Sequence, residues 1–234
     1  NGMPFASPSY VNLLDSALIK KDIIYAKEKD IDKLIVFVHW GVEYKDLPSQ
    51  NQKKYNKYFK ELGVDVVIGS HPHVIQPMIY EKDSLNNREF LTVYSLGNFV
   101  SNQRERRKDG GTMLRLAFSK NQDQITISTK EYLLTWVHKF KDQTKNHYQI
   151  LPCTHPKYSK EYFSNENDFD KMNTFIKDSR KHLNKNNQEV KEGLPQPRIR
   201  IEPHPPEKIK LNIKKRKVMV LNRDKRKRKK NKPH

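Results

Sequence analysis

Val64-Asp65-Val66-Val67-Ile68 is a short, mostly apolar segment that runs directly into Gly69-Ser70-His71-Pro72-His73. An earlier segment, Leu34-Ile35-Val36-Phe37-Val38, has the same character and runs into His39-Trp40-Gly41. Apolar side chains on both faces are typical of strands that are buried between two layers, as in a parallel sheet. The two segments therefore predict neighbouring buried strands that both end in histidine.

Helical patterns precede and separate these two strands. Apolar residues recur at helical spacing over residues 13–29, and Pro48-Ser49 offers an N-cap for a helix over 50–62 that Gly63 would end. The order helix, strand, helix, strand predicts an α/β layered sheet. Further strands are expected at 91–94, 112–118 and 125–135, the last two antiparallel, with a charged loop over 102–111 and a helix over 168–183.

Composition separates a body from a tail. The 234 residues include 46 Lys+Arg and 27 Asp+Glu, for a net charge of +19, and only 35% are hydrophobic, which is low for one compact α/β domain. Residues 207–234 alone hold fourteen basic and two acidic side chains. Residues 185–206 are rich in Pro, Asn, Gln and charge, which predicts a linker. We expect a folded body followed by a basic, disordered C-terminal tail.

Several classes of protein are excluded or disfavoured. No apolar run approaches the roughly 20 residues that span a bilayer. Cys153 is the only cysteine, so an internal disulfide framework and a CxxC zinc site are both excluded. The opening Asn1-Gly2-Met3-Pro4 has neither an initiator Met nor the features of a signal peptide. We expect the sequence to begin within a longer protein, with any targeting segment upstream.

The histidines after the two strands are the candidate site. In open α/β sheets ligands collect at the carboxyl ends of the strands, so His39, His71 and His73 are expected to converge. Pro72 stiffens an extended His-Pro-His segment whose imidazoles would point the same way. A single histidine after a strand is usually a loop residue, but three at adjacent strand ends favour a site for Zn, Mn, Fe, Co or Ni. Glu43 is the only carboxylate expected nearby.

Three stretches carry a resemblance to a known family. They are Val38–Tyr44 (VHWGVEY), Ile68–Pro77 (IGSHPHVIQP) and Tyr94–Val100 (YSLGNFV). In order and spacing they resemble consecutive C-terminal motifs of the bacterial capsule synthesis CapA family, the PGA_cap domain, over about residues 1–135. The resemblance implies a calcineurin-type, metallophosphatase-like layered sandwich. It also implies a role in making or exporting poly-γ-glutamate capsule outside the bacterial cytoplasmic membrane.

The resemblance assigns roles to particular residues. His39 stands where the superfamily has a lone histidine ligand, and His71 and His73 stand where it has a terminal Gly-His-x-His pair. The family's earlier Gly-Asp and Asn-Asn-His motifs have no match here, and Ser101-Asn102-Gln103 replaces a frequent Phe-Asp-Gln continuation. We therefore expect a partial domain over 1–150 with an incomplete site for divalent metal such as Mn, Fe or Zn. A partly helical extension over 151–184 and a linker and basic tail over 185–234 would follow.

The remaining candidates have structural alternatives. Trp40, Tyr44 and Phe99 could line a substrate pocket or belong to the core. Asn98 could turn its amide toward the site or serve a turn. Arg104, Arg106, Arg107 and Lys108 could steer a carboxylate-rich ligand or form a solvated loop.

The functional expectation is a component of poly-γ-glutamate capsule synthesis or export. In it His39, His71 and His73 hold metal and Glu43 orients the metal's ligands. The alternatives are a non-catalytic component that binds and exports a polyanion, or a metal-dependent phosphoesterase. Expected partners are the anionic polymer, other capsule synthesis membrane proteins, and the bacterial membrane through an upstream anchor or the basic tail. Nucleic acid is not expected, because no aromatic side chains interrupt the basic run at 225–230.

Overall fold

The computed structural model describes residues 13–122 and 124–194. These residues fall into two compact units, one ending at Leu34 and one beginning at Ile35. The first unit contains helix α1 (Ser16–Lys27), which begins where the Asp15 carboxylate accepts a hydrogen bond from the Leu18 backbone N–H at 2.9 Å. A polar side chain at this position satisfies a backbone donor that the helix itself leaves unpaired. The helix predicted over 13–29 is confirmed with slightly narrower bounds.

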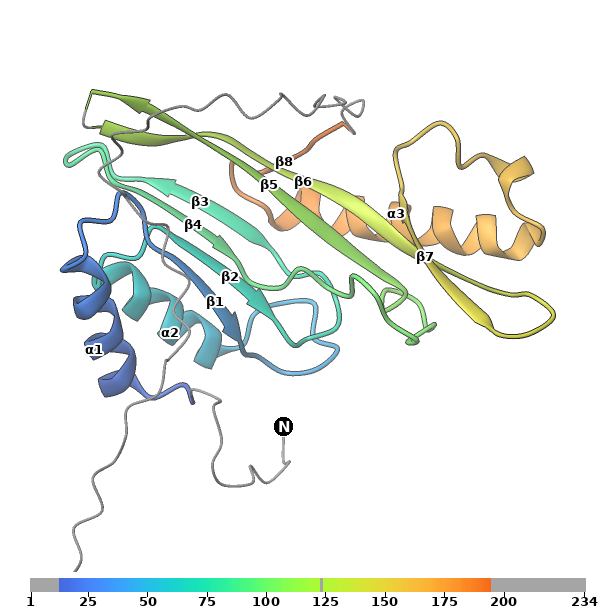
Figure 1. Cartoon of the computed structure of the whole chain (residues 1–234), viewed down its shortest axis with the longest axis horizontal. Helices are drawn as coiled ribbons and strands as arrows, with labels where there is room; N and C mark the ends of the chain where they lie inside the picture. Colours follow the sequence, from blue (N-terminus) through green and yellow to red (C-terminus); the bar gives the residue numbers. More distant parts are fainter. Residues whose placement is uncertain (1–12, 123, 195–234) are drawn as a thin grey trace, which may run out of the picture. The chain divides into compact units, whose positions relative to one another are not determined.

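The second unit is built on a mixed four-stranded sheet (Figure 1). Its strands are β1 (Ile35–His39), β2 (Val66–Ser70), β3 (Met78–Lys82) and β4 (Glu89–Val93), in the order β1-β2-β4-β3. β1, β2 and β4 are parallel and β3 is antiparallel to β4. Helix α2 (Gln50–Glu61) connects β1 to β2 and begins with a capping box in which the side chains of Ser49 and Gln52 bond each other's backbone N–H groups. The predicted helix-strand order of this region is confirmed.

β1 and β2 look alike in sequence but differ in burial. In β2, residues 66–69 are all buried, as predicted. In β1, by contrast, Phe37 is 69% exposed, so the expectation that this strand is buried on both faces is wrong. The core cluster includes Ile68 of β2, which is the register partner of Phe37, but it does not include Phe37, so the layer that covers β2 does not cover β1 at this position. β3 was not predicted.

A second sheet follows in the chain. It contains β5 (Gly110–Asn121), β6 (Gln124–Lys141) and β7 (Asn146–Pro152) in that order, and the short β8 (Lys191–Glu192) pairs with β6. β5 and β6 are antiparallel with a register shift at Ala117/Phe118, and both extend well beyond the predicted 112–118 and 125–135. β7 and β8 were not predicted, because β7 mixes polar and apolar residues and β8 is only two residues long.

The main core lies between the first sheet, the second sheet and helix α3 (Glu166–Asn186), which a short 3-10 turn η1 (Lys160–Tyr162) precedes. Phe175 of α3 is 1% exposed and packs with Trp136 of β6 in the same cluster as Leu91 of β4. Burying side chains of this size is the main stabilising contribution to such a fold. α3 confirms the helix predicted over 168–183.

The chain after α3 returns to the core. The Tyr80 backbone N–H donates to the Gln188 carbonyl and the Gln188 N–H donates to the Met78 carbonyl, both at 3.0 Å, and Val190 is buried. Residues 185–194 of the expected linker therefore belong to the fold. Residues 195–206 and the expected disordered basic tail lie outside the described residues, and the division at 150 and 184 stays a prediction.

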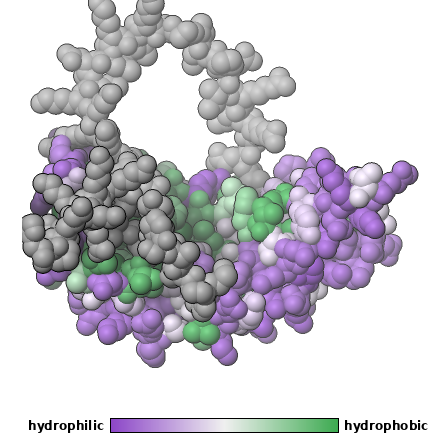
Figure 2. All heavy atoms as spheres, turned by 60° about the horizontal axis from the view of Figure 1, so that its bottom comes forward, coloured by the Kyte–Doolittle hydropathy of each residue, from purple (hydrophilic) through white to green (hydrophobic). Residues whose placement is uncertain are grey.

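The fold is α/β with two sheets around one core, and it fits part of a layered metallophosphatase-like sandwich. Figure 2 shows that the visible surface is largely hydrophilic, with hydrophobic residues gathered in a few patches. Within the described ranges, no helix combines the length and the apolar character that crossing a membrane requires.

Candidate metal centre

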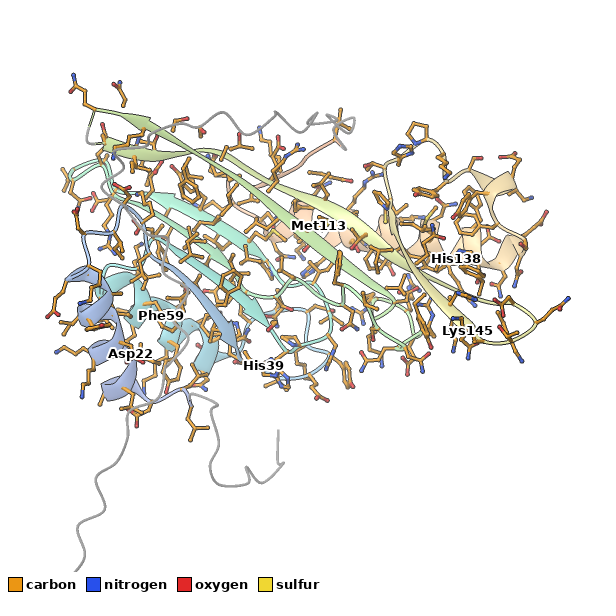
Figure 3. The ribbon with its side chains drawn as sticks, in the orientation of Figure 1. Asp22, His39, Phe59, Met113, His138 and Lys145 are labelled. Atoms are coloured by element: carbon orange, nitrogen blue, oxygen red, sulfur yellow. The ribbon has the colours of Figure 1, made fainter. Side chains whose placement is uncertain are left out.

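Parallel pairing brings the predicted histidines to one edge of the first sheet. β1 and β2 are in register with His39 opposite Ser70, so the residues that follow both strands emerge side by side. The ring centroids of His39 and His71 are 4.5 Å apart, and those of His71 and His73 are 6.1 Å apart. Figure 3 labels His39 at the carboxyl end of β1. This geometry agrees with the expectation that the three imidazoles share one edge.

The backbone that presents them is not extended, which corrects the sequence-based argument. His71 has φ 106° and His73 has φ 60°, both in the left-handed region that residues with a side chain rarely adopt. Tyr44, with φ 63°, approaches from the neighbouring loop, and its N–H donates to the Pro72 carbonyl at 2.7 Å. Strained backbone of this kind concentrates at functional sites, where the surrounding structure holds it in place.

Glu43, His71 and His73 form a cluster that could hold a metal ion. One ligand atom from each lies within 4.8 Å of the others, with Glu43 exposed and the two histidines half-buried. Burial and the neighbouring His39 lower the pKa of His71, and the Glu43 carboxylate opposes this shift. His71 is therefore neutral near pH 7, the form that binds metal.

The donor set of this cluster fits one divalent transition metal ion. Two imidazoles and one carboxylate are the ligands of several catalytic zinc sites. His39 stands beside this set rather than within it. Its ring contacts that of His71, and its Nδ1 lies 3.5 Å from the Ser70 hydroxyl oxygen.

Trp40 is buried and belongs to the core. Its side chain is 4% exposed, its ring stacks on that of Tyr94, and its Nε1–H donates to the Tyr94 carbonyl at 2.9 Å. Phe99, by contrast, is half exposed. The structure therefore places Trp40 as support for the ends of β1 and β4 rather than on an open pocket wall.

Two other predicted residues do reach the cluster. The Asn98 Oδ1 lies 2.9 Å from the Nδ1 of His73, and Asn98 is buried. The ring of Tyr44 stacks on that of His73 with centroids 5.9 Å apart, and its hydroxyl oxygen accepts a hydrogen bond from the Gln103 Nε2 at 3.2 Å. Both side chains therefore contact a candidate ligand.

The basic loop is occupied by protein partners. Arg106 forms a bidentate pair with Asp178 of α3 at 2.5 and 2.7 Å, and Arg107 pairs with Asp46. The Arg104 guanidinium lies over the Trp136 ring at 5.2 Å, and burial lowers its pKa. Lys108 alone of this group reaches the site, with its Nζ 4.2 Å from the Tyr44 ring centroid.

Gln76 is a residue of the site that sequence reasoning did not single out. It is fully buried, its Oε1 accepts from the Gln52 Nε2 at 2.8 Å, and its Nε2 donates to the Lys45 and Leu47 carbonyls at 2.7 and 3.2 Å. These bonds fix the loop that carries Glu43. Gln76 lies in the same motif as the paired histidines, but only the folded chain shows which backbone groups it satisfies.

Histidines and a carboxylate at the carboxyl edge of an α/β sheet define a candidate metal-binding protein. Residues 2–103 match the family model of the bacterial capsule synthesis protein PGA_cap, so this part of the chain is similar to that family. The match includes His39, Glu43, His71, His73 and Asn98 and ends just before Arg104.

The chain is also similar to two curated proteins. The chain is 31% identical over 99 residues to the PGA biosynthesis protein CapA of Bacillus subtilis (strain 168), covering 42% of this chain and 24% of that protein. It is 38% identical over 77 residues to the capsule biosynthesis protein CapA of Bacillus anthracis, covering 33% of this chain and 17% of that protein. The chain thus matches about a quarter or less of the length of these relatives.

Proposed function

We propose that this chain acts in bacterial capsule synthesis and binds a divalent metal ion through Glu43, His71 and His73. The family match and the names of the two CapA relatives support the capsule assignment. The observation that carries the metal assignment is the convergence of one carboxylate and two imidazoles within 4.8 Å. A bound metal of this type supplies a Lewis acid that activates water or polarises an oxygen.

The protein's own residues would prepare the site for such an ion. Glu43 contributes the negative charge that two neutral imidazoles lack. His39 packs against His71 and limits the space in which that ring can turn. With Mn, Fe or Zn bound, the class of reaction would be hydrolysis or group transfer. In the alternative function, that of a metal-dependent phosphoesterase, the substrate would be a phosphoester.

We further propose that the working protein lies on the outer side of a bacterial membrane, with poly-γ-glutamate and other capsule synthesis proteins as partners. The relatives' names support the polymer, since one of them is described as a PGA biosynthesis protein. A non-catalytic role in binding the polymer would use the basic side chains of the loop after Tyr94–Val100. This role has weaker support than the metal site, because Arg106 and Arg107 are already paired with Asp178 and Asp46.

Calorimetric titration of Mn²⁺ and Zn²⁺ into the full chain tests the metal assignment. We expect binding near one equivalent, and its loss in His71→Ala/His73→Ala, because a single remaining carboxylate cannot retain the ion. His155→Ala is the matched control, since His155 is an exposed histidine outside the cluster. Equal affinity in the wild type and the double variant would refute the site. Polymer binding that survives in the metal-free double variant would favour the polymer-binding alternative.

A further inference from the structure

We propose that four side chains, His73, Asn98, Gln103 and Tyr44, form a closed ring that holds His73 in the tautomer with its proton on Nδ1. Asn98 and Gln103 are then positioning residues for a metal ligand. This inference deepens the proposed function and rests on it for its consequence. The geometry of the ring is a separate observation that does not require a metal.

The orientation of the Asn98 amide follows from its other partners. Its Nδ2 donates to the Lys108 carbonyl at 2.8 Å and to the Gln103 Oε1 at 3.0 Å. A carbonyl can only accept, so the atom facing Lys108 must be the amide nitrogen, and Oδ1 must face His73. The Nδ1 of His73, 2.9 Å from that oxygen, is therefore the donor.

The remaining two members close the ring. Because the Gln103 Oε1 accepts from Asn98, its Nε2 is the atom that donates to the Tyr44 hydroxyl at 3.2 Å. The Tyr44 ring returns to His73 by stacking at 5.9 Å with an angle of 30° between the rings. Each member is thus held on two sides, which fixes the His73 ring more firmly than one hydrogen bond would.

The loop that supplies Asn98 and Gln103 is itself anchored at several points. The Asn98 N–H donates to the Gly110 carbonyl at 3.1 Å, where β5 begins. Farther along, Arg106 is clamped to Asp178 of α3, and Arg107 is clamped to Asp46 in the loop that also carries Tyr44. The part of the chain after the family match, through β5 and α3, therefore helps to position a residue of the metal cluster.

The consequence is a preorganised ligand. A neutral imidazole with its proton on Nδ1 has its lone pair on Nε2, which is the nitrogen left for a metal. Partners that orient metal-binding histidines typically contribute 10–100-fold to metal affinity. We expect Asn98→Ala to weaken Mn²⁺ or Zn²⁺ binding by a factor in that range.

The direct test is the tautomer of His73 in the metal-free full chain. Proton-nitrogen correlation NMR of the ¹⁵N-histidine-labelled chain distinguishes Nδ1–H from Nε2–H. The spectra are recorded at a pH where the His73 imidazole is neutral, and its signals are assigned by comparison with His73→Gln. We expect Nδ1–H in the wild type and loss of this preference in Asn98→Ala. Asn102→Ala is the matched control, because Asn102 lies in the same loop but bonds Lys139 and Tyr148.

A second pair of variants covers the case in which Asn98→Ala does not fold. Gln103→Ala opens the ring and should weaken the Nδ1–H preference. Gln103→Glu should retain it, because a carboxylate can accept from both Asn98 and the Tyr44 hydroxyl. The proposal would be overturned if His73 of the wild type carried its proton on Nε2. It would also be overturned if the variants that open the ring left both the tautomer and the metal affinity unchanged. An equal effect of Asn102→Ala would overturn it as well.

Failure of the two proposals can be told apart. Nδ1–H in a wild-type chain that binds no metal would leave the ring intact and refute the metal site. Metal binding that depends on His71 and His73, in a chain whose His73 carries its proton on Nε2, would refute only the ring.

Discussion

Gly69→Ala is expected to destabilise the sheet edge that carries the candidate metal cluster. A Cβ atom at this position would lie 2.2 Å from the Tyr94 carbonyl oxygen and 2.3 Å from the Trp40 Nε1. Neither partner can retreat easily, because Tyr94 contributes its backbone and Trp40 is buried while donating to that same carbonyl. The methyl group must therefore displace the indole or separate β2 from the residues that follow β4.

The magnitude follows from these two effects. Overpacking a filled core costs about 1–3 kcal/mol, and loss of the hydrogen bond from Trp40 to Tyr94 adds about 0.5–1.5 kcal/mol. We expect the free energy of unfolding to fall by about 2–4 kcal/mol, which for a chain of this size lowers the melting temperature by roughly 5–15 °C. Metal affinity should fall as well, because His71 follows Gly69 by two residues.

Thermal unfolding followed by circular dichroism measures this effect. Ser70→Ala is the control, because its side chain is exposed and the contact that its hydroxyl makes with His39 in the described part of the chain is long at 3.5 Å. A change within about 0.5 kcal/mol is expected for such a surface substitution. A Gly69→Ala chain that melts within 2 °C of the wild type (roughly 0.5–1 kcal/mol) would show that the close approach of Trp40 does not constrain this position.

Two further predictions concern the second sheet and α3. Phe175→Ala should lower the free energy of unfolding by about 3–5 kcal/mol, because it empties a fully buried aromatic site, whereas the exposed Lys177→Ala on the same helix should change it by less than about 0.5 kcal/mol. Denaturant titration distinguishes them, and equal small effects would mean that α3 is not part of the core. His138, which Figure 3 labels on β6, has its pKa lowered by burial and by Arg104 against the opposing Asp168. The folded state therefore binds its proton less readily than the unfolded state, and stability should decline as the pH falls below about 6.5. His138→Phe should show a smaller decline between pH 7.5 and 5.5 by the same measurement, and an equal decline would exclude His138 as a source of the pH dependence.

Local sequence was sufficient to predict the elements whose signals are local. Ser49 starts α2 through its own hydroxyl, and the apolar run 64–68 forms β2. The chain direction of two parallel strands then places His39 and His71 at one edge, because parallel strands end together. The candidate ligands could therefore be named before the structure was known, and Glu43 was found by proximity in sequence.

What the sequence could not determine depends on partners that are distant in the chain. Phe37 and Val67 look equivalent in sequence, yet one is exposed and the other buried, because packing of distant elements covers β2 but not β1 at Phe37. Arg106 and Asp178 are 72 residues apart, so no local pattern reveals that a basic loop is already neutralised by a helix. Pairing of charges and strands is decided by tertiary packing, which sets each side chain's neighbours.

The same division holds within the candidate metal cluster itself. The sequence predicted that Asn98 is either a site residue or a turn residue, and both predictions were based on its neighbours in the chain. Only the fold brings its amide between His73, 25 residues earlier, and Lys108, 10 residues later. Sequence therefore determined which chemical groups this protein can bring to the edge of its sheet. The tertiary structure decided their orientation, because hydrogen-bond direction depends on atoms that meet only when the chain has folded.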